Sequence, residues 1–182
     1  LDRMNKDNNI NYCETIEATN PCAEQPLPPY GCCCLGSINL TRFIQHPFTK
    51  KAKFDEVAFG QCVATSVRML DNVLDATHWP LPQQAQEAAN KRRIGLGFTG
   101  LGDALIMLCL RYDTKEARAM ATRISEVMRD AAYLASVELA KERGPFPLFN
   151  ADMYLSGGNF ASRLPMAVKE QIDRKSTRLN SS

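Results

Sequence analysis

Residues 20–40 read NPCAEQPLPPYGCCCLGSINL, and this stretch decides how the chain is expected to fold. Its first part, like the rest of residues 1–30, is polar or rich in proline, which excludes long regular elements there. From Cys34 to Leu40 the pattern changes to a short apolar run that is compatible with a strand. The sequence therefore predicts a loop that leads into a strand, with cysteines at the junction.

Two long helices are predicted further along the chain. The first should place one set of apolar positions on a single face: Phe54, Val57, Ala58, Cys62, Ser66, Met69, Leu70, Val73 and Leu74. The second repeats this spacing from Ala117 to Ala135, with Thr114 as its expected N-terminal cap and an end near Gly144.

Shorter elements are expected around these helices. They are a polar helix over 83–90, a brief strand over 92–97, a buried helix over 104–110 that contains Cys109, and a loop over 146–165. Helices joined by short strands indicate an α/β or α+β architecture with helices dominant.

The charge balance and hydropathy exclude several kinds of partner. The chain has 22 Lys and Arg against 20 Asp and Glu, and a net charge of +2 is too small to attract a nucleic acid polymer or a membrane surface. No apolar stretch reaches the roughly 18 to 20 residues that span a bilayer, and the first residues lack the apolar block of a signal peptide. We therefore expect a cytoplasmic protein.

The two ends of the chain differ from those of a complete protein. The first residue is Leu1, and the opening is polar, which favours a piece of a longer chain. Residues 175–182 are polar and aperiodic and are similar to a translated sequencing adapter. We expect one partial domain over 1–174 and a non-native tail over 175–182.

Seven cysteines are unevenly placed, and five of them crowd the first fifth of the chain: Cys13, Cys22, Cys32, Cys33 and Cys34. An odd, crowded set is not a secreted disulfide framework; in a reducing compartment it is typical of metal ligation, thiol redox chemistry or nucleophilic catalysis. Repeated pairs of cysteines separated by two residues, as zinc sites need, are absent from the sequence. We expect Cys13 and Cys109 to be buried and structural.

Asn20, Cys22 and Glu24 alternate along the chain, so in an extended segment their side chains would point to one side. A thiol supplies one-electron or nucleophilic chemistry, a carboxylate moves protons, and an amide holds a hydroxyl. The same residues are also compatible with a proline-rich surface loop that contains a cysteine without a function. In a strand, Cys33 would face away from its two neighbours, and because a vicinal disulfide is strained, redox pairing outside the triplet is preferred.

These motifs, together with RRIGLG at 92–97 and TGLGDAL at 99–105, resemble the catalytic chain of ribonucleotide reductases. The similarity runs from Asp7 to Ile172, and the eleven-residue step from Cys22 to Cys33 is most similar to the adenosylcobalamin-dependent class. The resemblance implies an α/β fold: part of a ten-stranded α/β barrel, with a finger loop that carries the radical cysteine.

The resemblance also implies a role for each residue of the motif at 20–24. Cys22 would become the thiyl radical that removes the 3′ hydrogen of a ribonucleotide. Glu24 would take the proton of the 3′ hydroxyl, and Asn20 would hold the substrate. Pro21 and Ala23 belong to the same substrate-binding segment.

Cys33 is then one of two thiols that reduce the 2′ position and end as a disulfide, with its partner outside this chain. The implied cofactor is adenosylcobalamin, with a radical-generating dimetal partner subunit as the alternative, and the reductant is of thioredoxin or glutaredoxin type. Relatives commonly dimerise, so a homodimer is one arrangement open to the whole protein, and the partial chain alone should be inactive. The alternative function is a zinc-binding or thiol-rich interaction module without enzymatic activity.

Two other patterns are given structural interpretations. The glycines from Gly95 to Gly100 match the dinucleotide-binding spacing, but residues 89–93 are not the apolar strand that this motif requires. A close-packed strand-to-helix turn explains them better. Arg92 and Arg93 are interpreted as part of a solvated turn rather than as phosphate ligands.

Overall fold

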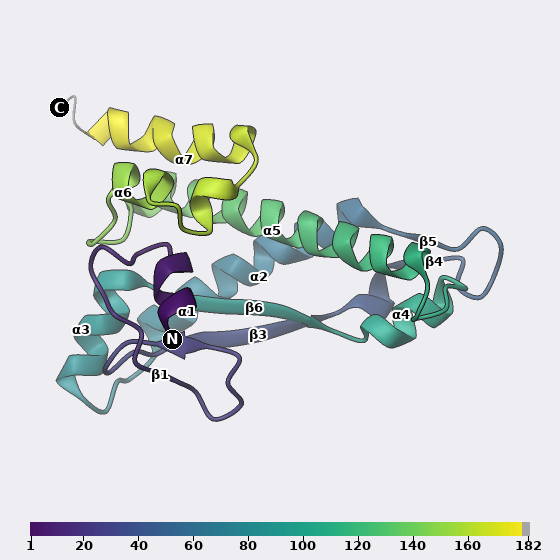
Figure 1. Ribbon diagram of the computed structural model, residues 1–182, viewed down its shortest axis with the longest axis horizontal. Coiled ribbons are helices and arrows are strands. Elements are labelled where there is room, and N and C mark those ends of the chain that lie inside the picture. Colours follow the sequence, from purple (N-terminus) through teal and green to yellow (C-terminus); the bar gives the residue numbers. More distant parts are fainter. Residues whose placement is uncertain (180–182) are drawn as a thin grey trace. The chain divides into compact units, whose positions relative to one another are not determined.

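A computed structural model describes the backbone of residues 1–179 and the side chains of residues 1–173 (Figure 1). The chain forms two compact units, each built from separate segments. Unit 1 comprises Leu1–Cys34, Asp71–Gly95 and the residues from Val137 onward, and unit 2 comprises Leu35–Leu70 and Leu96–Ser136. Four elements begin in one unit and end in the other: α2 (Glu56–Ala76), α5 (Lys115–Arg143), β3 (Cys34–Asn39) and β6 (Ile94–Thr99).

Unit 2 has an apolar core to which both long helices contribute. The core members are Ile38, Leu40, Phe54, Phe59, Val63, Ala104, Ile124 and Met128. The Phe59 ring meets the rings of Phe43 and Phe54 edge to face, with centroids 5.3 and 5.2 Å apart, which is a geometry that aromatic pairs prefer. Each fully buried apolar side chain of this size contributes about 1.5 to 3 kcal/mol by leaving water.

Helix α2 lies where the periodicity predicts it, but the predicted buried face is wrong in part. Phe59, Val63 and Val67 are buried, whereas Val57 and Met69 of the predicted face are exposed. The helix carries two apolar stripes, and the one that contains the large Phe59 ring is held in the core by the other phenylalanines. Ring packing, which periodicity does not contain, therefore selects the face.

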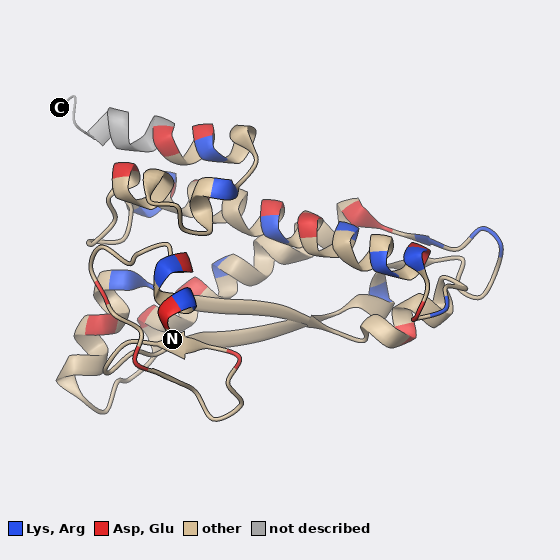
Figure 2. Cartoon of the chain, in the orientation of Figure 1, with Lys and Arg blue, Asp and Glu red and all other residues tan. Residues whose placement is uncertain are grey.

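Helix α5 has the bounds that the sequence predicts: it begins after Thr114 and ends just before Gly144. Ala117 N donates to Thr114 Oγ1 at 3.2 Å, so Thr114 satisfies one of the free amides of the first turn. Figure 2 shows Lys and Arg positions (blue) and Asp and Glu positions (red) interleaved along the ribbon of this helix. One of them, Arg123, pairs with Glu56 of α2.

The glycine motif forms a strand-to-helix turn, as predicted. β6 pairs with β3 in a two-stranded sheet, in which the two strands lie side by side (Figure 1). Gly100 follows β6 with a left-handed φ of 74° and precedes α4 (Leu101–Met107). A Cβ at Gly100 would lie 2.9 Å from Asn39 Oδ1, which accepts a hydrogen bond from Thr41 N. Only glycine fits this approach without strain.

The prediction for Cys109 is wrong, because Cys109 lies beyond α4 and is exposed. Its φ is 59°, its amide donates to Ile106 O at 2.9 Å, and the amide of Leu110 donates to Leu105 O at 2.8 Å. This pair of bonds is the Schellman motif, which ends a helix at a left-handed residue. The helix therefore stops before it reaches the cysteine.

Unit 1 contains the helices α1 (Asp2–Asp7), α3 (Pro82–Lys91), α6 (Ala151–Ser156) and α7 (Met166–Leu179), and the 3-10 turn η2 (Ala161–Arg163). The prediction of a loop over 146–165 is therefore wrong in part, because α6 and η2 lie within this range. Asn159 organises this region: it is fully buried, its Nδ2 donates to Tyr154 O at 3.1 Å, and its Oδ1 accepts from Ser162 N at 3.0 Å. A single buried amide holds α6 and η2 together.

The described residues mix helices with three two-stranded sheets, which confirms the mixed α/β class. The closed ten-stranded barrel and its finger loop remain predictions. Of the tail predicted over 175–182, residues 175–179 continue the backbone of α7, and residues 180–182 lie outside the described residues. No helix within residues 1–179 combines the length and apolarity needed to cross a membrane.

Candidate active site

A short β-hairpin carries the motif at 20–24. Strands β1 (Ala18–Thr19) and β2 (Pro26–Leu27) are antiparallel, with Ala18 opposite Leu27 and Thr19 opposite Pro26. Residues 20–25 close the hairpin, because Asn20 N donates to Gln25 O at 3.1 Å and Gln25 N donates to Asn20 Oδ1 at 3.0 Å. Cys22 lies in this turn and is exposed. The proline-rich segment therefore presents a free thiol at a hairpin turn.

The extended arrangement predicted for this motif is wrong, although two of its polar groups do meet. Ala23 has a φ of 62°, and its amide donates to Asn20 O at 3.0 Å, so the segment turns back on itself. Asn20 Nδ2 consequently donates to Glu24 Oε1 at 2.5 Å. A left-handed backbone costs energy at a residue other than glycine, and the hairpin bonds hold it in place.

The cysteine triplet lies at the start of β3. Cys33 directly precedes the strand and is half-buried, and its Sγ lies 3.7 Å from Cys34 O. The Cys32 Sγ contacts Gln84 O of α3 at 3.8 Å. Burial raises the pKa of the Cys33 thiol to about 12, while the charge of Arg93 acts in the opposite direction. All seven cysteines are free thiols, so the Cys33 pairing stays a prediction.

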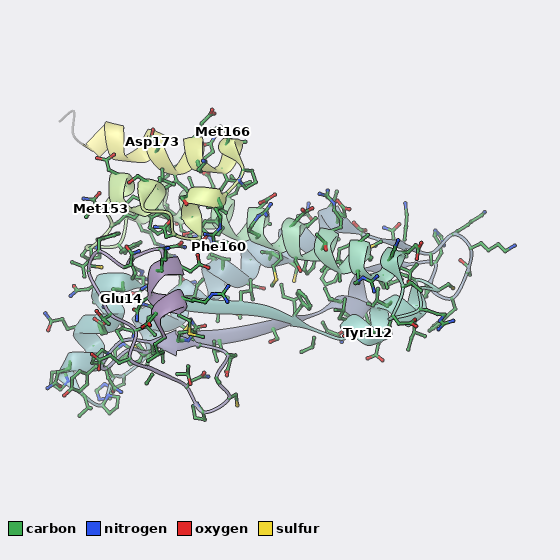
Figure 3. All side chains as sticks on the ribbon, in the orientation of Figure 1. Glu14, Tyr112, Met153, Phe160, Met166 and Asp173 are labelled. Atoms are coloured by element: carbon green, nitrogen blue, oxygen red, sulfur yellow. The ribbon has the colours of Figure 1, made fainter. Side chains whose placement is uncertain are left out.

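A buried cluster of charges lies in the same unit and comprises Glu14, Glu87, Lys91 and Arg93. Glu14 lies beside α3, and only 1% of its side chain is exposed (Figure 3). Its Oε1 accepts from Arg93 Nη2 and, at 2.7 Å, from Asn8 Nδ2. Its Oε2 lies 2.9 Å from Lys91 Nζ as an ion pair, and Lys91 also pairs with Glu87. We call these four residues the buried charge cluster.

The cluster keeps its carboxylate ionised. Burial alone raises the pKa of Glu14, but hydrogen bonds and charges from Arg93 and Lys91 outweigh burial and hold the pKa below its usual value. Glu14 was absent from the predicted site residues, and the solvated turn assigned to Arg93 is wrong. The sequence motif that contains Arg93 can be recognised, but Glu14, the partner of Arg93, lies 79 residues away in the sequence.

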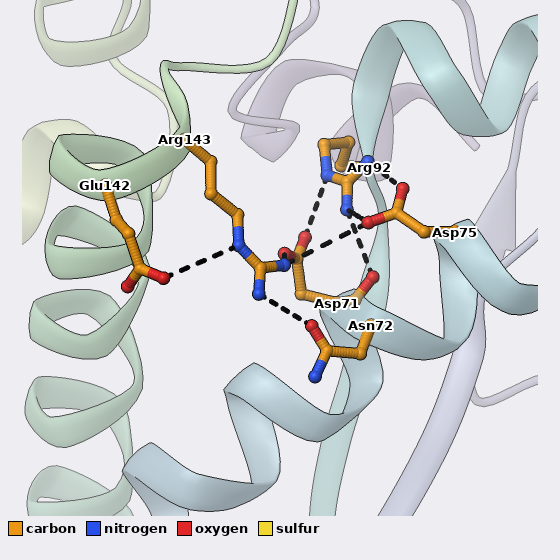
Figure 4. A network of polar contacts seen from close by, with 6 residues as sticks. All are labelled: Asp71, Asn72, Asp75, Arg92, Glu142 and Arg143. Carbon is orange, nitrogen blue, oxygen red and sulfur yellow. Dashed lines mark hydrogen bonds and ion pairs between the residues drawn. The ribbon is translucent and has the colours of Figure 1, made fainter.

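Arg92, the neighbour of Arg93, belongs to a separate network (Figure 4). Its φ of 47° ends α3, and its guanidinium donates to Asp71 at 2.8 Å and to Asp75 at 2.7 Å. Arg143 contacts the same Asp71 at 2.7 Å. The prediction of a solvated turn is therefore wrong for Arg92 as well, and its network joins the ends of three helices without contacting a cysteine.

The arrangement combines an exposed thiol, a carboxylate held by an amide, and a half-buried second thiol. An exposed thiol can exchange a hydrogen atom with a bound molecule, and the nearby carboxylate can take a proton from a hydroxyl. The charge of Glu24 adds slightly to the rise in the pKa of the Cys33 thiol, which is caused mainly by burial.

The described side chains give no support to the zinc-module alternative. Among residues 1–173 no group of three or more His, Cys, Asp or Glu side chains is arranged to hold a metal ion.

Comparisons with known proteins agree on one family. The family described as "Ribonucleotide reductase, barrel domain" matches residues 1–180. A vitamin B12-dependent ribonucleoside-diphosphate reductase of Mycobacterium tuberculosis is 41% identical over 158 residues, which cover 87% of this chain and 22% of that protein. The enzyme of the same name from Thermoplasma acidophilum is 41% identical over 81% of this chain and 19% of its own length.

Some of the less similar relatives have names that do not mention vitamin B12. A ribonucleoside-diphosphate reductase subunit alpha of Chlamydia pneumoniae is 32% identical over 86% of this chain and 15% of its own length. The chain thus spans about a fifth of the length of the curated relatives that it matches.

Proposed function

Because this chain belongs to the ribonucleotide reductase barrel-domain family, we propose that it is part of the catalytic chain of an adenosylcobalamin-dependent ribonucleoside-diphosphate reductase. The observation that carries the proposal is the hairpin turn, where an exposed Cys22 thiol lies two residues from the bonded pair of Asn20 and Glu24. The names of the relatives at 41% identity support the class.

In the proposed reaction the Cys22 sulfur, as a thiyl radical, takes the 3′ hydrogen of the ribose. Glu24 takes the proton of the 3′ hydroxyl, which eases departure of the 2′ hydroxyl as water. Asn20 holds Glu24 and the substrate in register, and Pro21 and Ala23 shape the turn that binds the substrate.

Cys33 and a second thiol outside this chain then supply two electrons and two protons. The products are a 2′-deoxyribonucleotide, water and a disulfide, and the hydrogen on Cys22 returns to the 3′ carbon. A dithiol protein of thioredoxin or glutaredoxin type reduces the disulfide before the next turnover.

The chemistry that adenosylcobalamin supplies when bound is the initiating radical. Cys22 is accessible to such a source because its turn is exposed, and the same exposure would suit a dimetal partner subunit. Turnover that depends on added adenosylcobalamin supports the first source, and turnover without cobalamin supports the second. A reducing compartment such as the cytoplasm suits seven free thiols, and a homodimer is one assembly open to the whole protein.

The test compares two exposed cysteines in the full-length enzyme. Cys22→Ser should lower ribonucleotide reduction to background, because serine cannot form the sulfur radical, whereas Cys109→Ser should keep the activity. The readout is deoxynucleotide formed with adenosylcobalamin and a dithiol reductant. Turnover that survives in Cys22→Ser, or a wild-type enzyme that reduces no ribonucleotide with either radical source, contradicts the proposal.

A further inference from the structure

Arg93 is held on one side by a buried carboxylate. Glu14 accepts from the Arg93 guanidinium, and Asn8 and Lys91 occupy the remaining positions around the same carboxylate. The Arg93 side chain is 17% exposed, so little water competes for it. A guanidinium fixed in this way has few other orientations, and its charge acts in a defined direction.

Arg93 and Cys33 occupy corresponding positions in the fold. Cys33 directly precedes β3 and Arg93 directly precedes β6, and the two strands pair. Both strands begin in unit 1 and end in unit 2, so the residues that precede them lie at the same end of the pair. Arg93, one member of the buried charge cluster, is therefore beside the thiol that the proposed function assigns to redox exchange.

The groups that act on Cys33 differ in sign. Burial, Cys34, Cys32 and Glu24 all disfavour the thiolate form, and Arg93 is the one group among these that favours it. A half-buried thiol without a nearby cation would be a poor leaving group when its disulfide is reduced, because charge would develop on sulfur in a partly apolar site.

We propose that Glu14 and Arg93 form a positioning pair in which Glu14 orients the Arg93 guanidinium toward Cys33 and so stabilises the Cys33 thiolate released when the reductase disulfide is reduced. This inference rests on the proposed function, because it needs Cys33 to be a redox thiol. It adds two residues from the buried charge cluster to the machinery that restores the enzyme between turnovers.

The proposed step balances as an ordinary thiol–disulfide exchange. A thiolate of the reducing dithiol attacks the sulfur bonded to Cys33, the bond between that sulfur and Cys33 breaks, and its electron pair stays on the Cys33 sulfur. Arg93 faces this negative charge until a proton arrives. The second thiol of the reductant then attacks the mixed disulfide that the first step leaves. The reductant departs as a disulfide, and the enzyme gains two electrons and two protons.

The experiment measures Cys33 directly in the full-length enzyme, with Cys32 and Cys34 replaced by Ser so that one thiol of the triplet remains. The rate of Cys33 alkylation by iodoacetamide is followed by peptide mass spectrometry between pH 7 and 10. Arg93→Gln should slow the reaction about tenfold at a given pH, since an adjacent opposite charge shifts a pKa by about one unit or more. Arg93→Lys should restore most of the rate.

Glu14→Gln should reproduce part of the Arg93→Gln effect, because Arg93 would lose its orientation and keep its charge. Arg92→Gln is the matched control, since the adjacent arginine is bound to Asp71 and Asp75, and it should leave the rate unchanged. Pre-reduced Arg93→Gln enzyme should also keep its first-turnover yield of deoxynucleotide while its re-reduction by thioredoxin slows.

Unchanged Cys33 alkylation in Arg93→Gln, or an equal loss in Arg92→Gln, overturns the pairing. The alkylation readout needs no turnover, so it separates this outcome from failure of the proposed function. If wild-type enzyme gives no deoxynucleotide while Arg93→Gln still slows alkylation, the function fails and the electrostatic pairing holds. If deoxynucleotide forms and alkylation is insensitive to residue 93, the pairing fails alone.

Discussion

Glu14 carries a charge in a place where an unpaired charge would be costly. Glu14→Gln leaves Lys91 and Arg93 buried without their common carboxylate, and we expect a loss of about 3 kcal/mol in the free energy of unfolding of the full-length protein. Urea unfolding monitored by circular dichroism measures it. Glu17→Gln is the control, because Glu17 lies on the same segment and is exposed.

The same substitution has a defined pH dependence. The folded-state pKa of Glu14 is below its unfolded value, so its stabilisation is complete above the unfolded pKa and is lost as the pH falls through the folded pKa. The difference between wild type and Glu14→Gln should therefore be full at pH 7 and shrink below about pH 4. A difference that grows on acidification contradicts this assignment.

Glu24 offers a separate test of proton transfer at the hairpin turn. Glu24→Gln keeps an oxygen that accepts from Asn20 Nδ2 but loses the ability to take a proton. We expect kcat to fall about 10² to 10⁴-fold, the usual contribution of a positioned acid or base. Substrate binding, measured by equilibrium dialysis, should change little, and Glu17→Gln should leave kcat unaffected. Equal losses in binding and kcat would make Glu24 a purely structural residue.

At the residue scale, the sequence was sufficient to predict that Cys22 lies in a loop and that Cys33 lies at the start of a strand, but it did not predict that Cys22 is exposed. The contact of Asn20 with Glu24 was expected for the wrong reason, because a turn rather than an extended segment brings them together. The Glu14 and Arg93 pair lay beyond sequence reasoning, since nothing local marks two charges 79 positions apart as partners.

Among the elements, α5 depends on its first turn. Thr114→Ala removes the oxygen that accepts from Ala117 N, and we expect it to lower the free energy of unfolding by about 1 kcal/mol. Thr122→Ala is the control: Thr122 lies on the same helix, is exposed, and bonds only within it. Chemical denaturation of the full-length protein measures both, and a larger loss at Thr122 would remove the capping role.

The face of α2 gives a second test at this scale. Val63 is fully buried and Val57 is 73% exposed, although the sequence pattern favours the face that contains Val57. Val63→Ala should cost about 2 kcal/mol of stability, while Val57→Ala should fall within about 0.5 kcal/mol of wild type. A larger loss of stability in Val57→Ala than in Val63→Ala would mean that the predicted face is the buried one.

The elements also show where sequence reasoning reaches its limit. Long periodic segments and a cap residue were sufficient to predict α2 and α5, because their signals are local. The choice of face on α2 depends on the Phe59 ring meeting Phe43 and Phe54. The short helix α6 depends on the buried Asn159 amide, which resembles any other loop asparagine in the sequence.

For the molecule as a whole, the proposed chemistry needs more than this chain supplies. The proposed function places the second redox thiol outside residues 1–182, so we expect the isolated chain to form no deoxynucleotide with adenosylcobalamin and thioredoxin. Mixing it with the full-length enzyme should not raise the rate. Turnover by the isolated chain would require another described thiol, such as Cys32 or Cys34, to act as the partner of Cys33.

The discontinuous composition of the two units has a consequence for how this region can change in evolution. Unit 1 is assembled from three segments and unit 2 from two, and four helices or strands continue from one into the other. An uninterrupted stretch of the gene that encodes the whole of either unit therefore also encodes part of the other. A single recombination event of this kind cannot exchange one unit and leave the other intact.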